Sequence, residues 1–379
     1  MTRLPNRILR DPALQSVFDA IGAGGHRAWL VGGAVRNALL DEPVGDLDLA
    51  TDAPPDAVMR LARAAGLKPV PTGFDHGTVT VVADGRGFEV TTLRHDVETD
   101  GRRAVVAFSD DLAQDARRRD FTMNALYADR HGTVIDLVGG LDDLRVRHLR
   151  FVGDPAQRIA EDYLRILRFF RFLAWYGRDA DPGAVAACRD GRDGLDGISR
   201  ERIGQELRKL LMAPDPLPAV RLMQDTGVLD KVLPDATPDR LYALQSPAPW
   251  LARLAALSQA DLSDALRLSR SDSRNHRILV TALSEDWSFN RIAYRLHGEL
   301  AHAAALLVQT GPSGPRDGWP AAQAAARPLP ITAADLQPHL QGPALGRALK
   351  AAEDAWIDAG FAMPAPALID IALLAGETA

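Results

Sequence analysis

The chain has 379 residues, enough for two or three domains of ordinary size, and 46% of them are hydrophobic and 25% charged. This composition is typical of a folded globular protein and excludes a disordered or collagen-like chain. A single cysteine, Cys188, excludes an internal disulfide framework, and no apolar run reaches the length of a membrane span. Met1 to Asp19 carries charges throughout and lacks the apolar core of a signal peptide, so we expect a cytoplasmic protein.

The formal net charge is −6, so any contact with nucleic acid must depend on local groups of arginine rather than on overall charge. Almost all of the positive charge is arginine, because the chain has only four lysines. A GC-rich genome would explain this composition, but it would not explain where the arginines stand.

Helix and strand patterns alternate over the first 145 residues, and the rest of the chain is predicted to be nearly all helical. We therefore expect an α+β protein with a head domain over 1–145, a helical neck and body over 146–240, and a helical body and tail over 241–379. In chain order, the patterns of the first part predict helices over 12–24, 34–40, 56–65, 110–114 and 117–127, strands over 29–31, 46–50, 68–73, 78–83, 88–94 and 133–137, and a loop over 95–103.

The first candidate site is the glycine pair Gly32-Gly33, between the predicted strand 29–31 and the helix 34–40. Such a turn lets backbone N–H groups approach a phosphate, and the helix N-terminus adds partial positive charge. Arg36 stands in the first turn, where it could reach the same phosphates. A tight turn without a ligand is the alternative interpretation.

Asp46 and Asp48 are two residues apart, so on a strand their side chains project to the same side. Neighbouring carboxylates repel each other, and a hard divalent cation such as Mg²⁺ compensates that charge and also binds phosphates. An acidic, solvated strand end is the simpler alternative. A phosphate-binding turn followed within about twenty residues by paired aspartates favours a metal-dependent nucleotidyl transferase.

Two more head residues are candidates for the same chemistry. Glu89 lies on the strand predicted beside the paired aspartates, where it is either a third catalytic carboxylate or a charge on an edge strand. Asp120 competes with it for the role of third carboxylate. Asp120 follows Arg118 and Arg119, an arginine run that is either a solvated face or a triphosphate-binding group.

The stretch from Asp154 to Phe172 is predicted to be one helix, on which Asp162 and Arg165 are neighbours on one face. Arg168 and Arg171 continue the series at three-residue steps, and a surface ladder of ion pairs is the alternative. A carboxylate accepts from an exocyclic amine and a guanidinium donates to a ring nitrogen. Cytosine and adenine both present these groups, whereas uracil and guanine present the reverse, so the pair would accept CTP and ATP.

These motifs resemble those of the class II CCA-adding enzyme (tRNA nucleotidyltransferase) and bacterial poly(A) polymerase family. The matching segments occur in family order from Trp29 to about Leu233: GGAVRN with Asp46-Leu47-Asp48, TLRHD with GRR, RRDFTMNA, DLVGGLDDL, EDYLRILRFFRF and ISRERIGQELRKLL. Asn37 stands where the family usually has Asp, and Ala104 where Pro often follows the loop. The segment 72–79 is similar to the CCA-adding version rather than to the poly(A) polymerase one.

The resemblance implies that Asp46 and Asp48 hold Mg²⁺ and that side chains of the head and of the neck and body contact the nucleotide. It also implies that Asp162 and Arg165 act as a protein template for the base. It implies that 95–103 is the flexible segment linked to the switch from C to A addition. Substrates would be CTP, ATP and the tRNA 3′ end. The sequence does not distinguish a monomer from a homodimer. The nucleotide-binding residues so implied, including the glycine turn, are Gly32, Gly33, Arg36, Arg119, Asp162, Arg165, Arg168 and Arg171.

Three other functions are compatible with the same motifs. A poly(A) polymerase would use ATP alone, a specialist would add only CC or only A, and a catalytically silent module would only bind RNA. The intact acidic and arginine residues disfavour the silent module.

Overall fold

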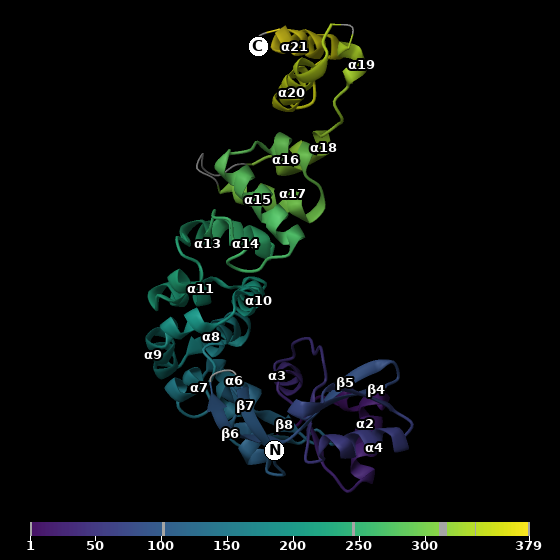
Figure 1. The fold of residues 1–379 in the computed structure, drawn as a ribbon, viewed down its shortest axis with the longest axis vertical. Helices are drawn as coiled ribbons and strands as arrows, with labels where there is room; N and C mark the ends of the chain where they lie inside the picture. Colours follow the sequence, from purple (N-terminus) through teal and green to yellow (C-terminus); the bar gives the residue numbers. More distant parts are fainter. Residues whose placement is uncertain (1, 101–102, 245–246, 311–316, 338, 378–379) are drawn as a thin grey trace. The chain divides into compact units, whose positions relative to one another are not determined.

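The computed structural model describes residues 2–100, 103–244, 247–310, 317–337 and 339–377. It forms two compact units, Met1–Pro234 and Asp235–Ala379. Strands are confined to the first unit among the described residues, and helices make up most of the rest, which confirms the α+β class (Figure 1). A search of the described helices finds none with the length and apolar character needed to cross a membrane.

The first unit contains a seven-stranded mixed sheet with the strand order β3-β4-β5-β2-β1-β8-β9. Strands β2 and β5 run parallel, whereas the other neighbours run antiparallel. The strands are β1 (Ala28–Val31), β2 (Leu49–Thr51), β3 (Lys68–Gly73), β4 (Thr78–Ala83), β5 (Arg86–Thr92), β8 (Leu126–Ala128) and β9 (Val134–Asp136).

Helices α2 (Pro12–Ala23) and α4 (Pro55–Ala64) cover strands β3 to β5 on one face of this sheet (Figure 1). Both helices begin as their sequences predict, with proline in the first turn. The alternation along β4 places Val79 and Val81 in the core, where they are fully buried. This core fixes the sheet that carries the candidate site.

Two predictions for the head are wrong in detail, and one of the two alternatives for Glu89 is excluded. The strand predicted over 46–50 begins only at Leu49, so Asp46 and Asp48 lie in the segment that leads into β2. Glu89 is not an edge-strand charge, because β5 pairs with β4 on one side and with β2 on the other. The predicted loop 95–103 falls mostly on a hairpin of β6 (Arg94–Asp100) and β7 (Arg103–Phe108), and 101–102 lie outside the described residues.

The helix predicted over 117–127 is also wrong. Helix α5 (Leu112–Arg117) ends where that helix should begin, and a short 3₁₀ turn, η2 (Thr122–Asn124), leads into β8. Tyr127 pairs there with Val31 of β1, and β-sheet pairing overrides the local pattern. The turn therefore brings the arginine run beside the end of β1.

Helices continue through the rest of the first unit, with one pair of short strands that the sequence did not predict. Strand β10 (His148–Leu149) pairs in parallel with β11 (Asp179–Ala180). The remaining elements of this unit are α1 (Asn6–Leu9), α3 (Gly33–Leu39), η1 (Phe74–His76), α6 (Gly140–Val146), α7 (Pro155–Glu161), α8 (Leu164–Tyr176), α9 (Pro182–Asp190), η3 (Arg192–Gly197), α10 (Arg200–Leu211), α11 (Leu217–Asp225) and α12 (Val228–Val232).

A cluster of aromatic rings joins α8 to the segment that follows α5. The ring centroid of Phe121 lies 4.9 Å from that of Phe151 and 5.0 Å from that of Phe172. Phe169 stacks on Phe151 at 5.6 Å, and both are fully buried. These contacts set the position of α8 relative to the sheet.

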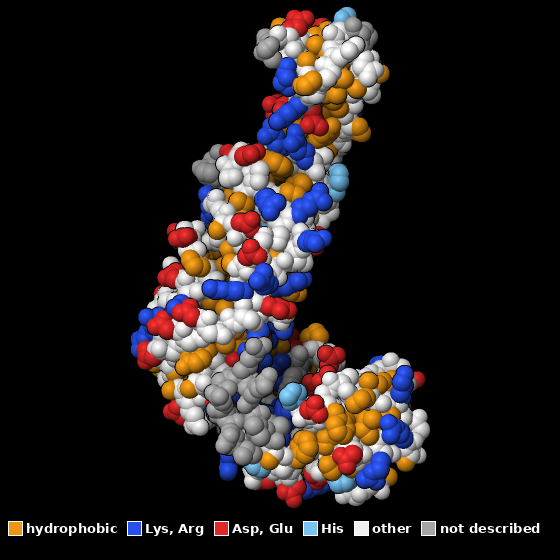
Figure 2. All heavy atoms as spheres, viewed as in Figure 1, with side chains coloured by type: hydrophobic (Ala, Val, Ile, Leu, Met, Phe, Trp, Pro, Cys, Tyr) orange, Lys and Arg blue, Asp and Glu red, His pale blue; other side chains and the backbone are white. Residues whose placement is uncertain are grey.

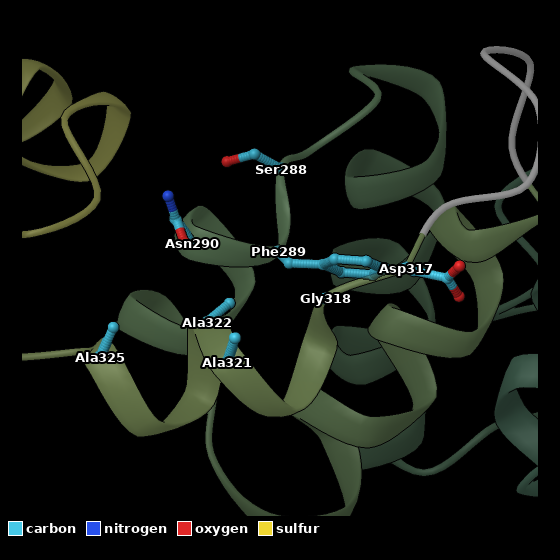
Figure 3. A pocket seen from close by; sticks show the side chains of 8 residues that line it. All are labelled: Ser288, Phe289, Asn290, Asp317, Gly318, Ala321, Ala322 and Ala325. Atoms are coloured by element: carbon cyan, nitrogen blue, oxygen red, sulfur yellow. The ribbon is translucent and has the colours of Figure 1, made fainter.

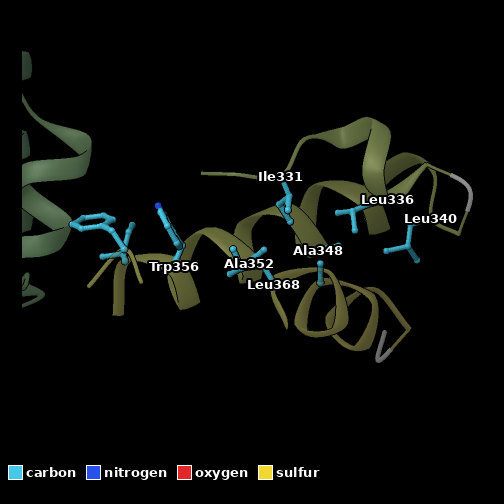
Figure 4. Close-up of a cluster of buried hydrophobic side chains, with 10 residues drawn as sticks. Ile331, Leu336, Leu340, Ala348, Ala352, Trp356 and Leu368 are labelled. Atoms are coloured by element: carbon cyan, nitrogen blue, oxygen red, sulfur yellow. The ribbon is translucent and has the colours of Figure 1, made fainter. Parts of the chain in front are cut away.

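All regular secondary structure among the described residues of the second unit is helical. Its helices α20 and α21 pack against each other around Leu336, Ala348, Trp356 and Leu368 (Figure 4). The helices are α13 (Asp239–Ala243), α14 (Trp250–Leu257), α15 (Arg270–Ser284), α16 (Phe289–Arg295), α17 (Gly298–Gln309), α18 (Trp319–Ala325), α19 (Ala333–Leu336), α20 (Gly342–Asp358) and α21 (Ala365–Glu377).

A pocket of about 600 Å³ lies between α16 and the start of α18 in this unit (Figure 3). Phe289 and Asp317 are among its lining residues, and Phe289 lies 6.1 Å from the ring of Trp319. None of the residues predicted for nucleotide chemistry lines it.

The glycine that starts α6 gives a direct test of the packing. A Cβ on Gly140 would lie 2.1 Å from the backbone oxygen of Thr122, so we expect Gly140→Ala to destabilise the protein by about 1–3 kcal/mol. Nothing lies within 4 Å of a Cβ on Gly22 in α2, so Gly22→Ala is the control and should stabilise by up to about 1 kcal/mol. Urea unfolding measures both, and equal stability of Gly140→Ala and wild type would contradict the packing.

Candidate active site

The glycine turn and the paired aspartates meet at one end of the sheet. The backbone N–H of Val31 donates to the carbonyl of Asp48 at 3.0 Å, and that of Gly32 donates to Leu126 at 3.2 Å. Gly32 has φ +64° and ψ −123°, a backbone conformation that residues other than glycine rarely adopt. It directly precedes α3. The structure thus places the turn, which directly follows β1, beside Asp48, which directly precedes β2.

Three carboxylates gather beside this turn. Burial raises the pKa of Asp48, and the charges of Glu89 and Asp46 raise it further, whereas Arg119 acts in the opposite direction. Asp46 and Glu89 are exposed, and Asp48 is half-buried. The site therefore holds an excess of negative charge that a cation would relieve.

The donor set fits a hard divalent cation in part. Carboxylate oxygens are the ligands such cations prefer, and Mg²⁺ often takes only one or two carboxylates together with substrate phosphates and water. Within the described residues, no three His, Cys, Asp or Glu side chains are close enough to form a metal site by themselves. Asp46 and Asp48 are thus candidate ligands that need the substrate to complete the coordination.

Arg119 lies next to the glycine turn, as a triphosphate-binding role requires. Its Nε donates to the hydroxyl of Tyr127 at 2.8 Å, and its Nη2 donates to Asp115 Oδ2 at 2.9 Å. Its Nη1 lies 3.8 Å from the position that a Cβ on Gly32 would occupy.

Arg36 belongs to α3, is 6% exposed, and packs its guanidinium against aromatic rings of α8. Its guanidinium carbon is 3.8 Å from the ring centroid of Tyr176, and its Nη2 donates to Asn37 at 2.9 Å. Nη1 donates to the side chain of Asn124. Asn37 thus orients the arginine and also donates to the carbonyl of Pro43, which gives the unusual residue after Arg36 a structural role.

Asp120, the other candidate for third carboxylate, is engaged in an ion pair. Arg168 Nε donates to it at 3.0 Å, and it also accepts from Asn124 and from the backbone N–H of Phe121. Burial alone would raise the pKa of Asp120, but the charge and hydrogen bonds of Arg168 hold that pKa down at about 2. Arg168 therefore links α8 to the arginine run.

This pair predicts a pH-dependent contribution to stability. Since the pKa of Asp120 falls from 3.8 to about 2 on folding, the charged form contributes about 2 kcal/mol above pH 4. That contribution is lost as the pH falls from 4 towards 2. We expect urea unfolding of Asp120→Asn to show a smaller loss of stability over this range than wild type.

The exposed Asp142 provides the control, because its side chain is 85% exposed. Asp142→Asn should keep the acid dependence of wild type. Identical acid dependence in Asp120→Asn and wild type would show that Asp120 is not held in its charged form by folding.

The predicted template helix is broken at Asp162. Helix α7 ends at Glu161, Asp162 is extended with φ −157° and ψ 104°, and α8 starts at Leu164. Asp162 and Arg165 are therefore not neighbours on a continuous helix face, but the backbone N–H of Arg165 still donates to the carbonyl of Asp162 at 2.9 Å. The break frees the Asp162 side chain from the helical face.

Both members of this pair already have partners in the absence of nucleotide. Asp162 Oδ2 accepts from Arg202 of α10 at 2.7 Å, and Oδ1 accepts from the backbone of Leu164 at 3.1 Å. Arg165 Nη1 donates to the carbonyl of Arg158 at 2.7 Å and to Glu161. A base would have to share or displace these contacts.

Arg171 faces α10, where its Nε donates to Glu206 at 2.6 Å and its guanidinium lies 4.4 Å from the ring of Phe172. Glu206 is 6% exposed. The positions 162, 165, 168 and 171 are thus held by specific buried or half-buried partners rather than forming a solvated ladder.

On the face shown in Figure 2, Lys and Arg are mixed with Asp and Glu over both units, in agreement with the net charge of −6.

Sequence reasoning missed the residues that hold the predicted ones in place. Asp115 stands four residues before Arg119, so the i,i+4 rule could have found it. Tyr127, Asn124 and Glu206 carried no such signal, because their contacts depend on sheet pairing and helix packing.

Comparison with known proteins supports a nucleotidyltransferase head. Residues 28–150 match the family model of the poly A polymerase head domain, and residues 180–240 match that of the probable RNA and SrmB-binding site of polymerase A. A CCA-adding enzyme of Streptococcus gordonii is 40% identical over 266 residues, which are 66% of this chain and 65% of that protein. The human mitochondrial CCA tRNA nucleotidyltransferase 1 is 40% identical over 235 residues, or 58% of this chain and 54% of that protein.

The crystal structure of the Bacillus stearothermophilus CCA-adding enzyme in complex with CTP is 30% identical, has a TM-score of 0.71, and matches over 92% of this chain and 94% of its own. The chain belongs to the CCA-adding enzyme family. The Thermotoga maritima CCA-adding enzyme complexed with tRNA is only 19% identical in sequence to this chain. It shares the fold over 99% of both chains, with a TM-score of 0.71.

The two matched regions cover only part of the candidate site. Gly32, Asp48 and Arg119 lie inside the head-domain match at 28–150, whereas 162–171 fall between the two matched segments. This chain spans about 65% of the length of the Streptococcus relative that it matches.

Proposed function

We propose that this member of the CCA-adding enzyme family adds C, C and A to the 3′ end of tRNA, using CTP and ATP, releasing pyrophosphate, and without a nucleic-acid template. The observation that supports the proposal most is the convergence of Asp46, Asp48, Glu89 and Arg119 beside the Gly32 turn. The Bacillus relative, 94% of whose chain matches this one, was solved in complex with CTP, which agrees with the proposal. The cytoplasm is the expected location.

For the chemistry at the RNA end, we assign Asp46 and Asp48 as the ligands of Mg²⁺, with Glu89 as the third carboxylate. Two such ions would be bound, one lowering the pKa of the RNA 3′-hydroxyl and the other stabilising the charge of the departing pyrophosphate. Glu89 is preferred over Asp120 because its charge acts on Asp48, whereas Asp120 is paired with Arg168. The hydroxyl then attacks the α-phosphorus in line, and no side-chain nucleophile is required.

For substrate binding, we assign the backbone of Gly32 and Gly33 together with Arg119 to the triphosphate. Asp162 and Arg165 select the base after exchanging their present partners, Arg202 and Glu161, for the amine and ring nitrogen of cytosine or adenine. Uracil or guanine would leave these groups unpaired, at a cost of roughly 1–3 kcal/mol for each group.

We further assign Arg36, Arg168 and Arg171 to the nucleotide site, on the basis of their place along α3 and α8. The head is assigned to 1–145, the neck and body to 146–240, and the body and tail, which would hold the tRNA by shape and phosphates, to 241–379. The division of the structure at Pro234 lies near the second of these boundaries.

An omission series tests the proposal. Purified protein with Mg²⁺ and tRNA that ends before CCA is given CTP, ATP or both, and an unrelated RNA serves as the second substrate. We expect CC with CTP alone, CCA with both nucleotides, and no extension of the unrelated RNA. Long A tails on both RNAs would identify a poly(A) polymerase, a partial tail would identify a specialist, and no addition would identify a silent RNA-binding module.

A further inference from the structure

Behind Arg119 lies a buried polar pair, Asp115 and Tyr127, to which the proposed reaction gives no role. Asp115 is 1% exposed and Tyr127 is fully buried. The large majority of buried polar groups are hydrogen-bonded, so the partners of this pair show what it holds. The nearest charged partner that the two share is Arg119.

The three side chains are joined by hydrogen bonds, and Asp115 Oδ1 also accepts from Arg118 Nε at 2.9 Å. The Tyr127 hydroxyl donates to Asp115 Oδ2 at 2.7 Å and accepts from Arg119 Nε at 2.8 Å. Asp115 Oδ2 also accepts from Arg119 Nη2 at 2.9 Å. Two of the three guanidinium nitrogens, Nε and Nη2, are thus held, and these contacts set the orientation of the group.

The third nitrogen of Arg119 points in the other direction. Nη1 lies 3.8 Å from the position of a Cβ on Gly32, and the positive charge of Arg119 acts on Asp48. The two ends of the guanidinium therefore serve different neighbours, the buried pair on one side and the glycine turn with the acidic group on the other.

Secondary structure ties this set to the glycine turn. Tyr127 pairs with Val31, the residue directly before Gly32, in the β1–β8 ladder. Asp115 lies in α5, one turn before Arg119. A shift of either element would move the arginine relative to the turn.

We propose that Asp115 and Tyr127 are positioning residues that present Arg119 Nη1 to the phosphates of the incoming nucleoside triphosphate. This inference rests on the proposed function, because it assumes a triphosphate at the Gly32 turn. The alternative is that the pair only stabilises the fold of the head.

A double-mutant cycle on CTP binding separates these two roles. Binding of CTP in the presence of Mg²⁺ is measured by calorimetry for wild type, Tyr127→Phe, Arg119→Ala and the double variant. We expect Tyr127→Phe to weaken binding about tenfold, the size of one lost charge-assisted hydrogen bond. We expect Arg119→Ala to weaken it more, and the double variant to match Arg119→Ala.

Melting temperatures of all variants show that they are folded, and Asp115→Asn replaces Tyr127→Phe if the latter does not fold. Tyr294→Phe, which removes a half-buried hydroxyl from α16 of the second unit, is the matched control and should bind CTP as wild type does. Effects of Tyr127→Phe and Arg119→Ala that multiply, or an unchanged affinity in Tyr127→Phe, would overturn the inference while leaving the proposed function intact. Failure of wild type to bind CTP would overturn both.

Discussion

Replacement of Asp48 by Asn is expected to reduce kcat/KM for CMP addition to tRNA by at least about a thousandfold, roughly 4 kcal/mol of transition-state stabilisation. The physical reason is the loss of a ligand charge at the point where Asp46, Glu89 and Arg119 converge. Since the three carboxylates repel one another, the same change should leave the melting temperature unchanged or raise it. Activity and stability would thus move in different directions.

The control for this prediction is Asp84→Asn, the same chemical change in the exposed turn between β4 and β5. Asp84 has φ +49°, which asparagine tolerates well, so its variant should keep full activity. Near-normal CMP addition by folded Asp48→Asn would remove Asp48 from the metal site.

Replacement of Asp162 by Ala is expected to relax base selection. The ratio of kcat/KM for CTP to that for UTP should fall by roughly 10- to 100-fold, because the group that accepts from the exocyclic amine is lost. Steady-state kinetics with each of the four nucleotides measures the ratio directly. Some loss of stability should accompany the change, since Asp162 also accepts from the backbone of Leu164.

Asp190→Ala controls for this second prediction, because Asp190 ends α9 with a side chain that is 68% exposed. Its variant should discriminate among the nucleotides as wild type does. If Asp162→Ala lowered the rates with all four nucleotides equally, Asp162 would be a structural residue and not part of a template.

The sequence predicts those features that depend on short-range patterns. The strand, glycine turn and helix around Gly32 could be predicted because each carries a local signal, and the parallel neighbour of β2 was expected beside the paired aspartates. The sequence predicts Asp46 and Asp48 on a strand, but both precede β2. The carbonyl of Asp48 accepts from the backbone N–H of Val31, and the paired strand starts at Leu49.

Other features depend on contacts between distant parts of the chain. The helix break at Asp162 is stabilised by Arg202, forty residues later, so no local pattern shows it. The local pattern predicts that Tyr127 is part of a helix, but pairing with Val31 places it in β8, where its hydroxyl accepts from Arg119. The partners that orient the predicted residues therefore appear only when the fold is known.

In the proposed function, protein side chains rather than a nucleic acid decide which nucleotide is joined to the RNA end. The most direct measurement incubates the protein with Mg²⁺, tRNA that lacks its last three nucleotides, and all four nucleoside triphosphates at equal concentration, and then sequences the 3′ ends. We expect tails of CCA that stop after A and contain no U or G. Tails with U or G, or runs of A, would rule out the proposed function.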